Sequence, residues 1–252
     1  EYIRLAPPIA DFAPDNPTGC PGHTVNFLNF SVADTTLNQW VWDFGDGHTS
    51  TQQNPSHTYH TPGLYTVTLT ARDVEGCEDV VVKSDLIRIY APPVAATFPA
   101  DTSGCAPFRV NYRSAATAGA SPITTWQWNF GNGNSATGAD PTATVFDPAG
   151  TYATVLTVTD GNGCRDTVQT NTTVWPRPVA NYTANLTAGC APVDVQFTDL
   201  SSGLYPLAGW AWSFGDGGSS NAQNPTHTYA TDGSYDVAMV LTDIHGCRDT
   251  MA

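Results

Sequence analysis

The amino-acid sequence repeats itself three times, and this internal period constrains the fold more than any other feature. One eight-residue motif occurs as WVWDFGDG, WQWNFGNG and WAWSFGDG, at residues 40–47, 126–133 and 210–217. Cys20, Cys105 and Cys190 precede the three motifs at equal intervals along the chain. A period of this length is typical of a chain built from copies of one structural unit.

Within each copy, apolar residues alternate with polar ones. Tyr65, Val67 and Leu69 occupy every second position, with threonines between them. This spacing predicts strands with one buried face, and no window has the period of a helix. Short strands at regular spacing favour an antiparallel β-sandwich. Tyr65 and its copies Tyr152 and Tyr235 are expected to act as tyrosine corners, in which the hydroxyl bonds a nearby backbone group.

The landmarks predict three domains: repeat 1 at 7–91, repeat 2 at 92–176, and repeat 3 at 177–252, which lacks its last strand. Residues 1–6 are interpreted as the last strand of an upstream repeat, because Ile3-Arg4-Leu5 echoes Ile87-Arg88-Ile89. The chain is therefore expected to be a segment of a longer array. Its junctions are rich in proline, which restricts backbone torsions, so a semi-rigid rod is predicted.

Trp175 stands at the junction between repeats 2 and 3. Two interpretations are open for its side chain. It packs between the two repeats, or it belongs to the core of its own repeat.

The charge excludes some functions. The chain has 23 acidic and 9 basic residues, a formal net charge of −14. Nucleic-acid binding requires a basic face that displaces phosphate counterions, and an anionic membrane surface would repel this chain. No apolar stretch approaches the ~20 residues of a membrane helix. Neither nucleic acid nor membrane insertion is expected.

The three tryptophan motifs, the NPxHTY segments at 54–59 and 224–229, and the Gly-x-Tyr strands with a trailing aspartate resemble the PKD (polycystic kidney disease) domain family over nearly the whole chain. The resemblance implies seven-stranded immunoglobulin-like sandwiches in surface-exposed proteins such as bacterial adhesins, S-layer proteins and secreted hydrolases. Cysteine-bearing arrays of this style are similar to stalks of large surface proteins of gliding Bacteroidota. Repeat 2 departs most from this family pattern. Asn129 and Asn132 replace Asp, and Ala143 and Val145 are aligned with the His and Tyr of the NPxHTY segments.

Each repeat contains two cysteines, and six cysteines permit 15 pairings. The repeat favours pairing inside each unit, which predicts the disulfides Cys20–Cys77, Cys105–Cys164 and Cys190–Cys247. Buried free thiols are the alternative, and a zinc site is disfavoured because no repeat has C-x-x-C spacing. Paired cysteines would place the protein in an oxidising compartment, at the cell surface or outside the cell.

Calcium is the one cofactor that the residues suggest. Ca²⁺ prefers six to eight oxygen ligands, carboxylates included. Asp15, Asp43 and Asp73 are the candidate ligands in repeat 1, at positions near which some PKD-like domains bind calcium. In the alternative interpretation, Asp43 caps backbone N–H groups of its turn.

No catalytic motif is present in the sequence, and the chain is interpreted as not an enzyme. His57 and His227 hold equivalent positions and are expected to make local hydrogen bonds. The paired tryptophans are expected to pack in the cores and not to form a sugar-binding platform. Short motifs mark Asn171 as a candidate for N-glycosylation, and Thr35, Thr167 and Thr250 as candidates for O-glycosylation.

The favoured function is a structural stalk or filament segment of an extracellular adhesin, which acts by reach, stiffness and resistance to tension. The alternatives are accessory binding modules of a secreted hydrolase, or an array that recognises protein or glycan. The expected partners are adjacent repeats of the same long chain and an extracellular protein or glycan.

Overall fold

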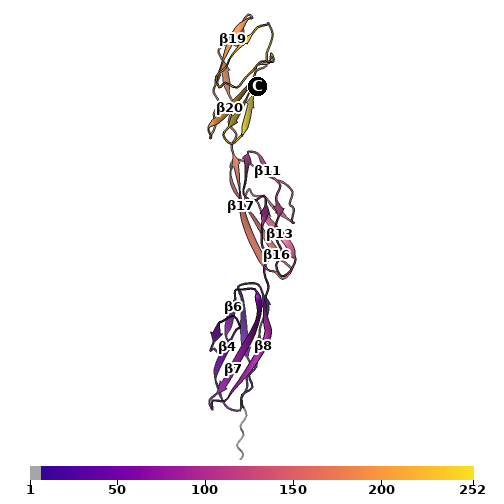
Figure 1. Cartoon of the computed structure of the whole chain (residues 1–252), viewed down its shortest axis with the longest axis vertical. Helices are drawn as coiled ribbons and strands as arrows, with labels where there is room; N and C mark the ends of the chain where they lie inside the picture. Colours follow the sequence, from indigo (N-terminus) through magenta and orange to yellow (C-terminus); the bar gives the residue numbers. More distant parts are fainter. Residues whose placement is uncertain (1–6) are drawn as a thin grey trace, which may run out of the picture. The chain divides into compact units, whose positions relative to one another are not determined.

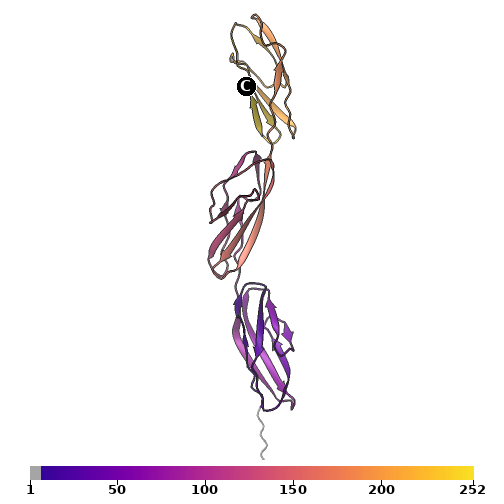
Figure 2. The same cartoon turned by 180° about the vertical axis from the view of Figure 1, so that it is seen from behind.

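The structure is a computed structural model that describes residues 7–252, and these residues form β-strands without any helix. The predicted all-β fold of immunoglobulin-like sandwiches is confirmed. Figure 1 shows the strands coloured along the sequence, and Figure 2 shows them from behind. The interpretation of residues 1–6 as an upstream strand lies outside the described residues.

Repeat 1 pairs a three-stranded sheet of order β1-β3-β6 with a five-stranded sheet of order β2-β8-β7-β4-β5. The strands are β1 Phe12–Pro14, β2 Thr18–Gly19, β3 His23–Asn29, β4 Leu37–Asp43, β5 Thr49–Ser50, β6 Ser56–Tyr59, β7 Gly63–Asp73 and β8 Glu78–Ile89. The neighbours β7 and β8 form a long antiparallel hairpin, and β2 runs parallel to the end of β8.

Repeat 2 has the same five-stranded sheet, in the order β10-β17-β16-β13-β14, with the pairs β11-β15 and β12-β9 opposite. The strands are β9 Thr97–Phe98, β10 Thr102–Cys105, β11 Phe108–Val110, β12 Arg113–Ser114, β13 Ile123–Asn129, β14 Ser135–Thr137, β15 Thr144–Phe146, β16 Gly150–Asp160 and β17 Arg165–Trp175.

Repeat 3 has a three-stranded sheet β18-β19-β22 and a four-stranded sheet β21-β20-β23-β24. The strands are β18 Tyr182–Ala184, β19 Val193–Asp199, β20 Leu207–Ser213, β21 Ser219–Ser220, β22 Thr226–Tyr229, β23 Ala238–Asp243 and β24 Arg248–Met251. Among the described strands of this repeat, no strand pairs with β24 on its outer side, where β2 and β10 stand in the other repeats.

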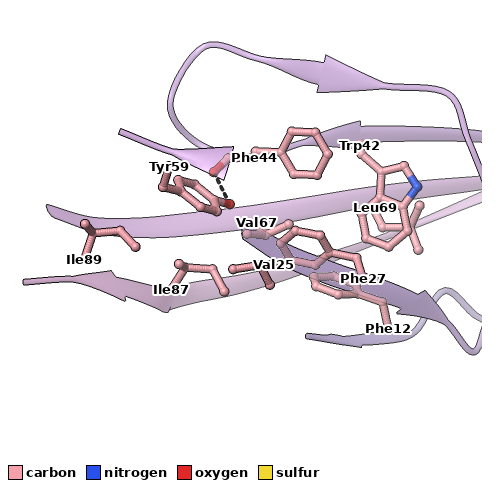
Figure 3. Packing of buried hydrophobic residues seen from close by; sticks show 10 residues of the cluster. All are labelled: Phe12, Val25, Phe27, Trp42, Phe44, Tyr59, Val67, Leu69, Ile87 and Ile89. Atoms are coloured by element: carbon pink, nitrogen blue, oxygen red, sulfur yellow. Dashed lines mark hydrogen bonds between the residues drawn. The ribbon is translucent and has the colours of Figure 1, made fainter. Parts of the chain in front are cut away.

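The alternating residues build the core, as their period predicts. In repeat 1, Trp42, Phe44 and Phe27 are buried together between the two sheets (Figure 3). The indole N–H of Trp42 donates to the Gln52 carbonyl at 2.8 Å, and Trp128 and Trp212 make the same type of bond to backbone carbonyls ten residues on. These three rings are therefore core residues, as expected, and not a sugar-binding platform, whereas the first ring of each pair, Trp40, Trp126 or Trp210, is only half-buried.

Two local devices repeat with the motif. Gly45 has a positive φ of 80°, and a side chain there would meet the Thr66 carbonyl at 2.3 Å, so this turn requires glycine. The predicted tyrosine corners are also present. The hydroxyl of Tyr65 donates to the Thr61 carbonyl at 2.6 Å, and Tyr152 and Tyr235 each bond the carbonyl four residues upstream.

The pairing in repeat 2 corrects one alignment. Phe146 lies opposite Phe108, three residues after the first cysteine, as Tyr59 lies opposite His23 in repeat 1. Thr144 and Phe146, and not Ala143 and Val145, therefore stand in the His and Tyr positions. One extra residue after the tryptophan motif shifts the sequence spacing without changing the sheet.

The core of repeat 2 contains a polar cluster that repeat 1 lacks. Tyr112, Thr154 and Thr172 are buried, and their hydroxyl groups bond one another, with Thr154 Oγ1 3.2 Å from the Tyr112 hydroxyl. The equivalent residues of repeat 1 are all apolar, namely Phe27, Val67 and Ile87. A buried hydroxyl is tolerated when its partners are present and costs free energy when they are removed.

This cluster predicts a non-additive set of variants. Tyr112→Phe should destabilise repeat 2 by about 1–3 kcal/mol, because Thr154 and Thr172 lose their shared partner. The triple variant Tyr112→Phe/Thr154→Val/Thr172→Val should recover most of this loss. Hydrogen–deuterium exchange in peptides of residues 97–175, measured against urea, gives the local stability. A triple variant less stable than Tyr112→Phe would contradict the role assigned to the cluster.

Candidate functional site

The cysteines pair between repeats and not within them. Cys20 of repeat 1 is bonded to Cys164 of repeat 2, and Cys105 of repeat 2 is bonded to Cys247 of repeat 3, each with Cα atoms 5.5 Å apart. The predicted pairs Cys20–Cys77, Cys105–Cys164 and Cys190–Cys247 are therefore wrong. The first cysteine of one repeat bonds the second cysteine of the next.

The length of the last strand explains the error. Cys77 directly precedes β8, whereas Cys20 follows Gly19, which pairs with Ile89 at the other end of β8. The strand has 12 residues, which span about 40 Å at roughly 3.3 Å per residue. A disulfide requires Cα atoms about 4.4–6.8 Å apart, so the two cysteines of one repeat cannot meet.

An aspartate holds each hairpin cysteine in place. The Asp243 carboxylate accepts hydrogen bonds from the backbone N–H groups of His245 and Cys247, at 2.9 and 2.8 Å. Asp73 and Asp160 accept the same bond from Cys77 and Cys164, both at 2.9 Å. The Asp-x-x-Gly-Cys pattern of the sequence is thus a turn that presents a thiol at the end of the hairpin.

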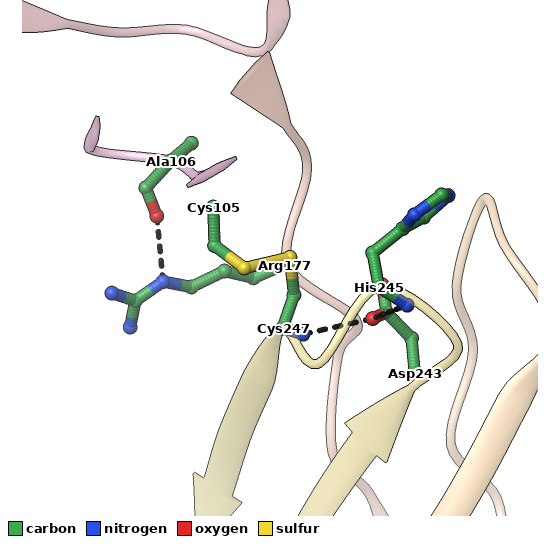
Figure 4. Close-up of a disulfide and its surroundings, with 6 residues drawn as sticks. All are labelled: Cys105, Ala106, Arg177, Asp243, His245 and Cys247. Atoms are coloured by element: carbon green, nitrogen blue, oxygen red, sulfur yellow. Dashed lines mark hydrogen bonds between the residues drawn. A yellow bond between two sulfur atoms is a disulfide. The ribbon is translucent and has the colours of Figure 1, made fainter. Parts of the chain in front are cut away.

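Other side chains surround the bond between repeats 2 and 3 (Figure 4). Arg177 Nε donates to the Ala106 carbonyl at 2.6 Å, next to Cys105. The rings of Trp175 and His245 stack with centroids 4.2 Å apart. Trp175 therefore packs on repeat 3, which was one of the two interpretations open from the sequence. The spacing of the sequence motifs did not indicate that Arg177 or His245 would lie beside this disulfide.

Two thiols stay unpaired among the described residues. Cys77 in the hairpin of repeat 1 and Cys190 at the start of repeat 3 are both free and exposed. Each holds the position at which a disulfide forms elsewhere in the chain.

The three candidate calcium ligands do not converge. Asp73 pairs with Leu37 at one end of the seven-residue strand β4, and Asp43 lies at the other end, about 20 Å away at roughly 3.3 Å per residue. One Ca²⁺ ion needs all its ligand atoms within about 2.6 Å of itself. Asp43 instead accepts a bond from the Gly45 N–H, and Asp15 bonds the side chain and backbone of Asn26. The predicted set of Asp15, Asp43 and Asp73 is not a calcium site in this structure.

Sequence reasoning missed a different cluster, formed by Asp46, His48 and His57. These are the one group of three acidic, His or Cys side chains in residues 7–252 whose ligand atoms lie within 4.8 Å of one another. One oxygen and two nitrogens suit a borderline metal such as Zn²⁺ better than Ca²⁺. Burial raises the pKa of Asp46, but hydrogen bonds, first from His57 at 2.7 Å, hold it below its usual value overall.

Repeat 3 shows that the Asp–His pair forms without a third donor. Asp216 bonds His227 Nε2 at 2.7 Å, and Gly218 stands in place of His48. The bond from His227 is the main reason that the pKa of Asp216 is lowered. The imidazole of His57 stacks on Phe44 with centroids 4.3 Å apart, as His227 stacks on Phe214. The expected local hydrogen bond of these histidines is confirmed, and it braces the tryptophan-motif turn.

The glycosylation candidates Thr35, Thr167, Thr250 and Asn171 are all exposed. The aspartates of two of these motifs have structural partners, because Asp166 accepts from the Ala95 N–H and Asp249 from the Ala180 N–H. The aspartate of these two motifs is therefore explained by a structural hydrogen bond. Modification of these threonines and of Asn171 stays a prediction.

The chain belongs to the PKD domain family, whose profile matches residues 5–89, 90–175 and 175–252. This confirms the resemblance drawn from the motifs. In residues 7–252, the structure has no helix long and apolar enough to cross a membrane.

Individual relatives match only in part. The chain is 49% identical over 51 residues to collagenase ColA of Bacillus cereus, which covers 18% of this chain and 5% of the relative. It is 30% identical over 138 residues to the pre-pro-metalloprotease PrtV of Vibrio cholerae, covering 55% of this chain and 15% of the relative. The solved PKD1 domain of Vibrio cholerae PrtV is 33% identical with a TM-score of 0.30, covering 33% of this chain and 98% of that domain. The chain thus spans a small part of the curated relatives it matches.

The disulfide pattern predicts a specific peptide map. The oxidised chain should contain two thiols that react with an alkylating reagent, Cys77 and Cys190. Digestion without reductant should release linked peptides that contain Cys20 with Cys164 and Cys105 with Cys247. Detection by mass spectrometry of a Cys20–Cys77 or Cys190–Cys247 peptide would contradict the structure, and a fully reduced sample is the control.

Proposed function

We propose that this chain is a non-catalytic, covalently cross-linked spacer in an extracellular protein, of the kind found in the stalk of a surface adhesin. The disulfides between successive repeats carry this proposal. A bond inside a domain stabilises that domain alone, whereas these bonds tie each repeat to its neighbour. Such bonds persist in oxidising compartments, which supports a location outside the cytoplasm.

The bonds also limit how far the chain extends under load. The shortest covalent path between the two termini follows residues 1–20, returns along 105–164 and ends along 247–252. At about 3.5 Å per residue, this path stretches to about 300 Å, against about 900 Å for the whole chain. A spacer with this pattern keeps its reach even if its domains unfold.

Single-molecule stretching tests this mechanical role. With both bonds intact, the chain held at its ends should reach about 300 Å and then resist further extension. Added reductant should release the remaining length, to about 900 Å in total. The Cys105→Ser/Cys247→Ser variant, which keeps one bond, should stop at about 390 Å. Full extension of the oxidised wild-type chain would overturn the spacer proposal.

The relatives favour a second candidate, an accessory module of a secreted protease. The matched proteins are named as collagenases and as a metalloprotease. A PKD domain that accompanies such an enzyme would assist it by contacting its substrate. Cosedimentation with collagen fibrils separates the two functions. A pure spacer should stay in the supernatant, whereas saturable binding that survives the Cys105→Ser/Cys247→Ser substitution would favour the accessory module.

A further inference from the structure

The cluster of Asp46, His48 and His57 lies at an open edge of the repeat 1 sandwich. Asp46 and His48 belong to the turn between β4 and β5, and His57 belongs to β6 of the other sheet. Strands β5 and β6 each stand last in the order of their sheets, so the cluster spans the gap between two edge strands. Both disulfides of the described residues join different repeats, so neither of them closes this edge.

The distances within the cluster suit one tetrahedral metal ion. Nδ1 of His48 lies 3.2 Å from Oδ1 of Asp46, and Nε2 of His57 lies 2.7 Å from Oδ2 of Asp46. Zn–N and Zn–O bonds are about 2.0–2.2 Å long, so the ligand atoms of a tetrahedral zinc ion stand roughly 3.4 Å apart. The three ligand atoms lie within 4.8 Å of one another. Small movements of the side chains therefore suffice to bring all three to one ion.

Two of the three side chains are held in place by their surroundings. Asp46 and His57 are only 16% and 13% exposed. The His57 ring lies flat on Phe44, and the Tyr59 hydroxyl fixes the same turn by donating to the Phe44 carbonyl at 3.1 Å (Figure 3). Oδ1 of Asp46 accepts the backbone N–H of His48 at 3.1 Å, which orients the carboxylate. Hydrogen bonds of this kind behind a metal ligand increase metal affinity.

His48 is the exposed third donor. Its side chain is 73% exposed, so it can turn toward an ion held by the other two residues. The side of the site that His48 does not cover faces solvent. A water molecule can complete the tetrahedron there, as it does in zinc sites with three protein ligands.

The other two repeats lack this third donor. Gly218 stands in the position of His48 in repeat 3, and Asn134 stands there in repeat 2. Repeat 3 nevertheless keeps the bond between Asp216 and His227 Nε2 at 2.7 Å. The brace of the tryptophan-motif turn therefore forms without a histidine in this position, and His48 adds a metal-ligating group that the fold does not require.

We propose that Asp46, His48 and His57 bind one Zn²⁺ ion, which clamps the open edge of repeat 1. Two imidazole nitrogens and one carboxylate oxygen are donors that this ion accepts. The net charge of −14 favours the approach of a cation. On binding, Nε2 of His57 exchanges its hydrogen bond with Asp46 for a bond to the metal, and the ring keeps its proton on Nδ1. The ion then links the turn of one sheet to β6 of the other.

Zinc titration of the untagged, oxidised chain tests the site. Cys77 and Cys190 are alkylated first, because thiolates also bind metals. Isothermal titration calorimetry should then give one Zn²⁺ ion per chain. His48→Gly should weaken this binding by at least about tenfold, because one ligand is lost.

Matched variants separate loss of a ligand from loss of the fold. His48→Gly introduces the residue of repeat 3, and Asp46→Asn introduces the residue that repeat 2 has as Asn132, so both turns are compatible with the sandwich. Asp46→Asn should also weaken binding by at least about tenfold. His60→Ala removes an exposed histidine outside the cluster and should bind zinc as the wild-type chain does.

Hydrogen–deuterium exchange locates the bound ion. At a Zn²⁺ concentration about 100 times the dissociation constant, opening of residues 44–59 should become up to about 100-fold rarer. The equivalent residues 214–229 of repeat 3 are the internal control and should exchange at an unchanged rate. No binding to the alkylated chain, equal affinity of the wild-type chain and both ligand variants, or equal protection of the two repeats would rule the site out.

Discussion

The extended length of the last hairpin determines how this chain is cross-linked. Because β8 and β17 each run the full length of a sandwich, the turn before the strand and the residues beside its end lie at opposite poles of the domain. A cysteine at each pole cannot bond its partner in the same repeat. It can form a disulfide only with a cysteine at the end of a neighbouring repeat. The length of this strand therefore leads to disulfides that link the three repeats in series.

The fold could be predicted almost completely from the sequence, because the residues that repeat are the ones that pack in the cores and form the turns. Alternation of Tyr65, Val67 and Leu69 follows from one buried face, and the glycine of the tryptophan motif follows from a backbone contact that excludes any side chain. Both signals are local. The tyrosine corner also joins residues four positions apart, so it too is visible in a short window of sequence.

The disulfide pairs and the metal ligands could not be predicted from the repeat, because they depend on distances within the sheets that the sequence spacing does not give. Counting two cysteines per unit suggested internal pairs, although a strand of 12 residues between them already implied separation along the sheet. Likewise, Asp43 and Asp73 both flank turns, but at opposite ends of β4. Asp46 and His57 come together because β6 returns beside the turn, and that pairing requires knowledge of the sheet order.

The three cores also show that one sandwich tolerates different chemistry. Tyr112, Thr154 and Thr172 replace three apolar residues at once, which keeps every hydroxyl bonded. The Asp–His brace of repeats 1 and 3 becomes an amide in repeat 2, where Asn132 donates to the Val145 carbonyl at 2.9 Å. In the hydroxyl cluster, a single change would leave a buried polar group without its partner.

The disulfides also interleave, since Cys105 lies between Cys20 and Cys164, and Cys164 lies between Cys105 and Cys247. A peptide bond cut anywhere between Cys20 and Cys247 leaves at least one disulfide spanning the break. The two fragments therefore remain one molecule, even when the cut falls in a proline-rich junction. Bonds confined to each repeat would not have this property, because one cut in a junction would divide the chain. An extracellular protease must therefore cleave this chain at two or more sites before any of its repeats is lost.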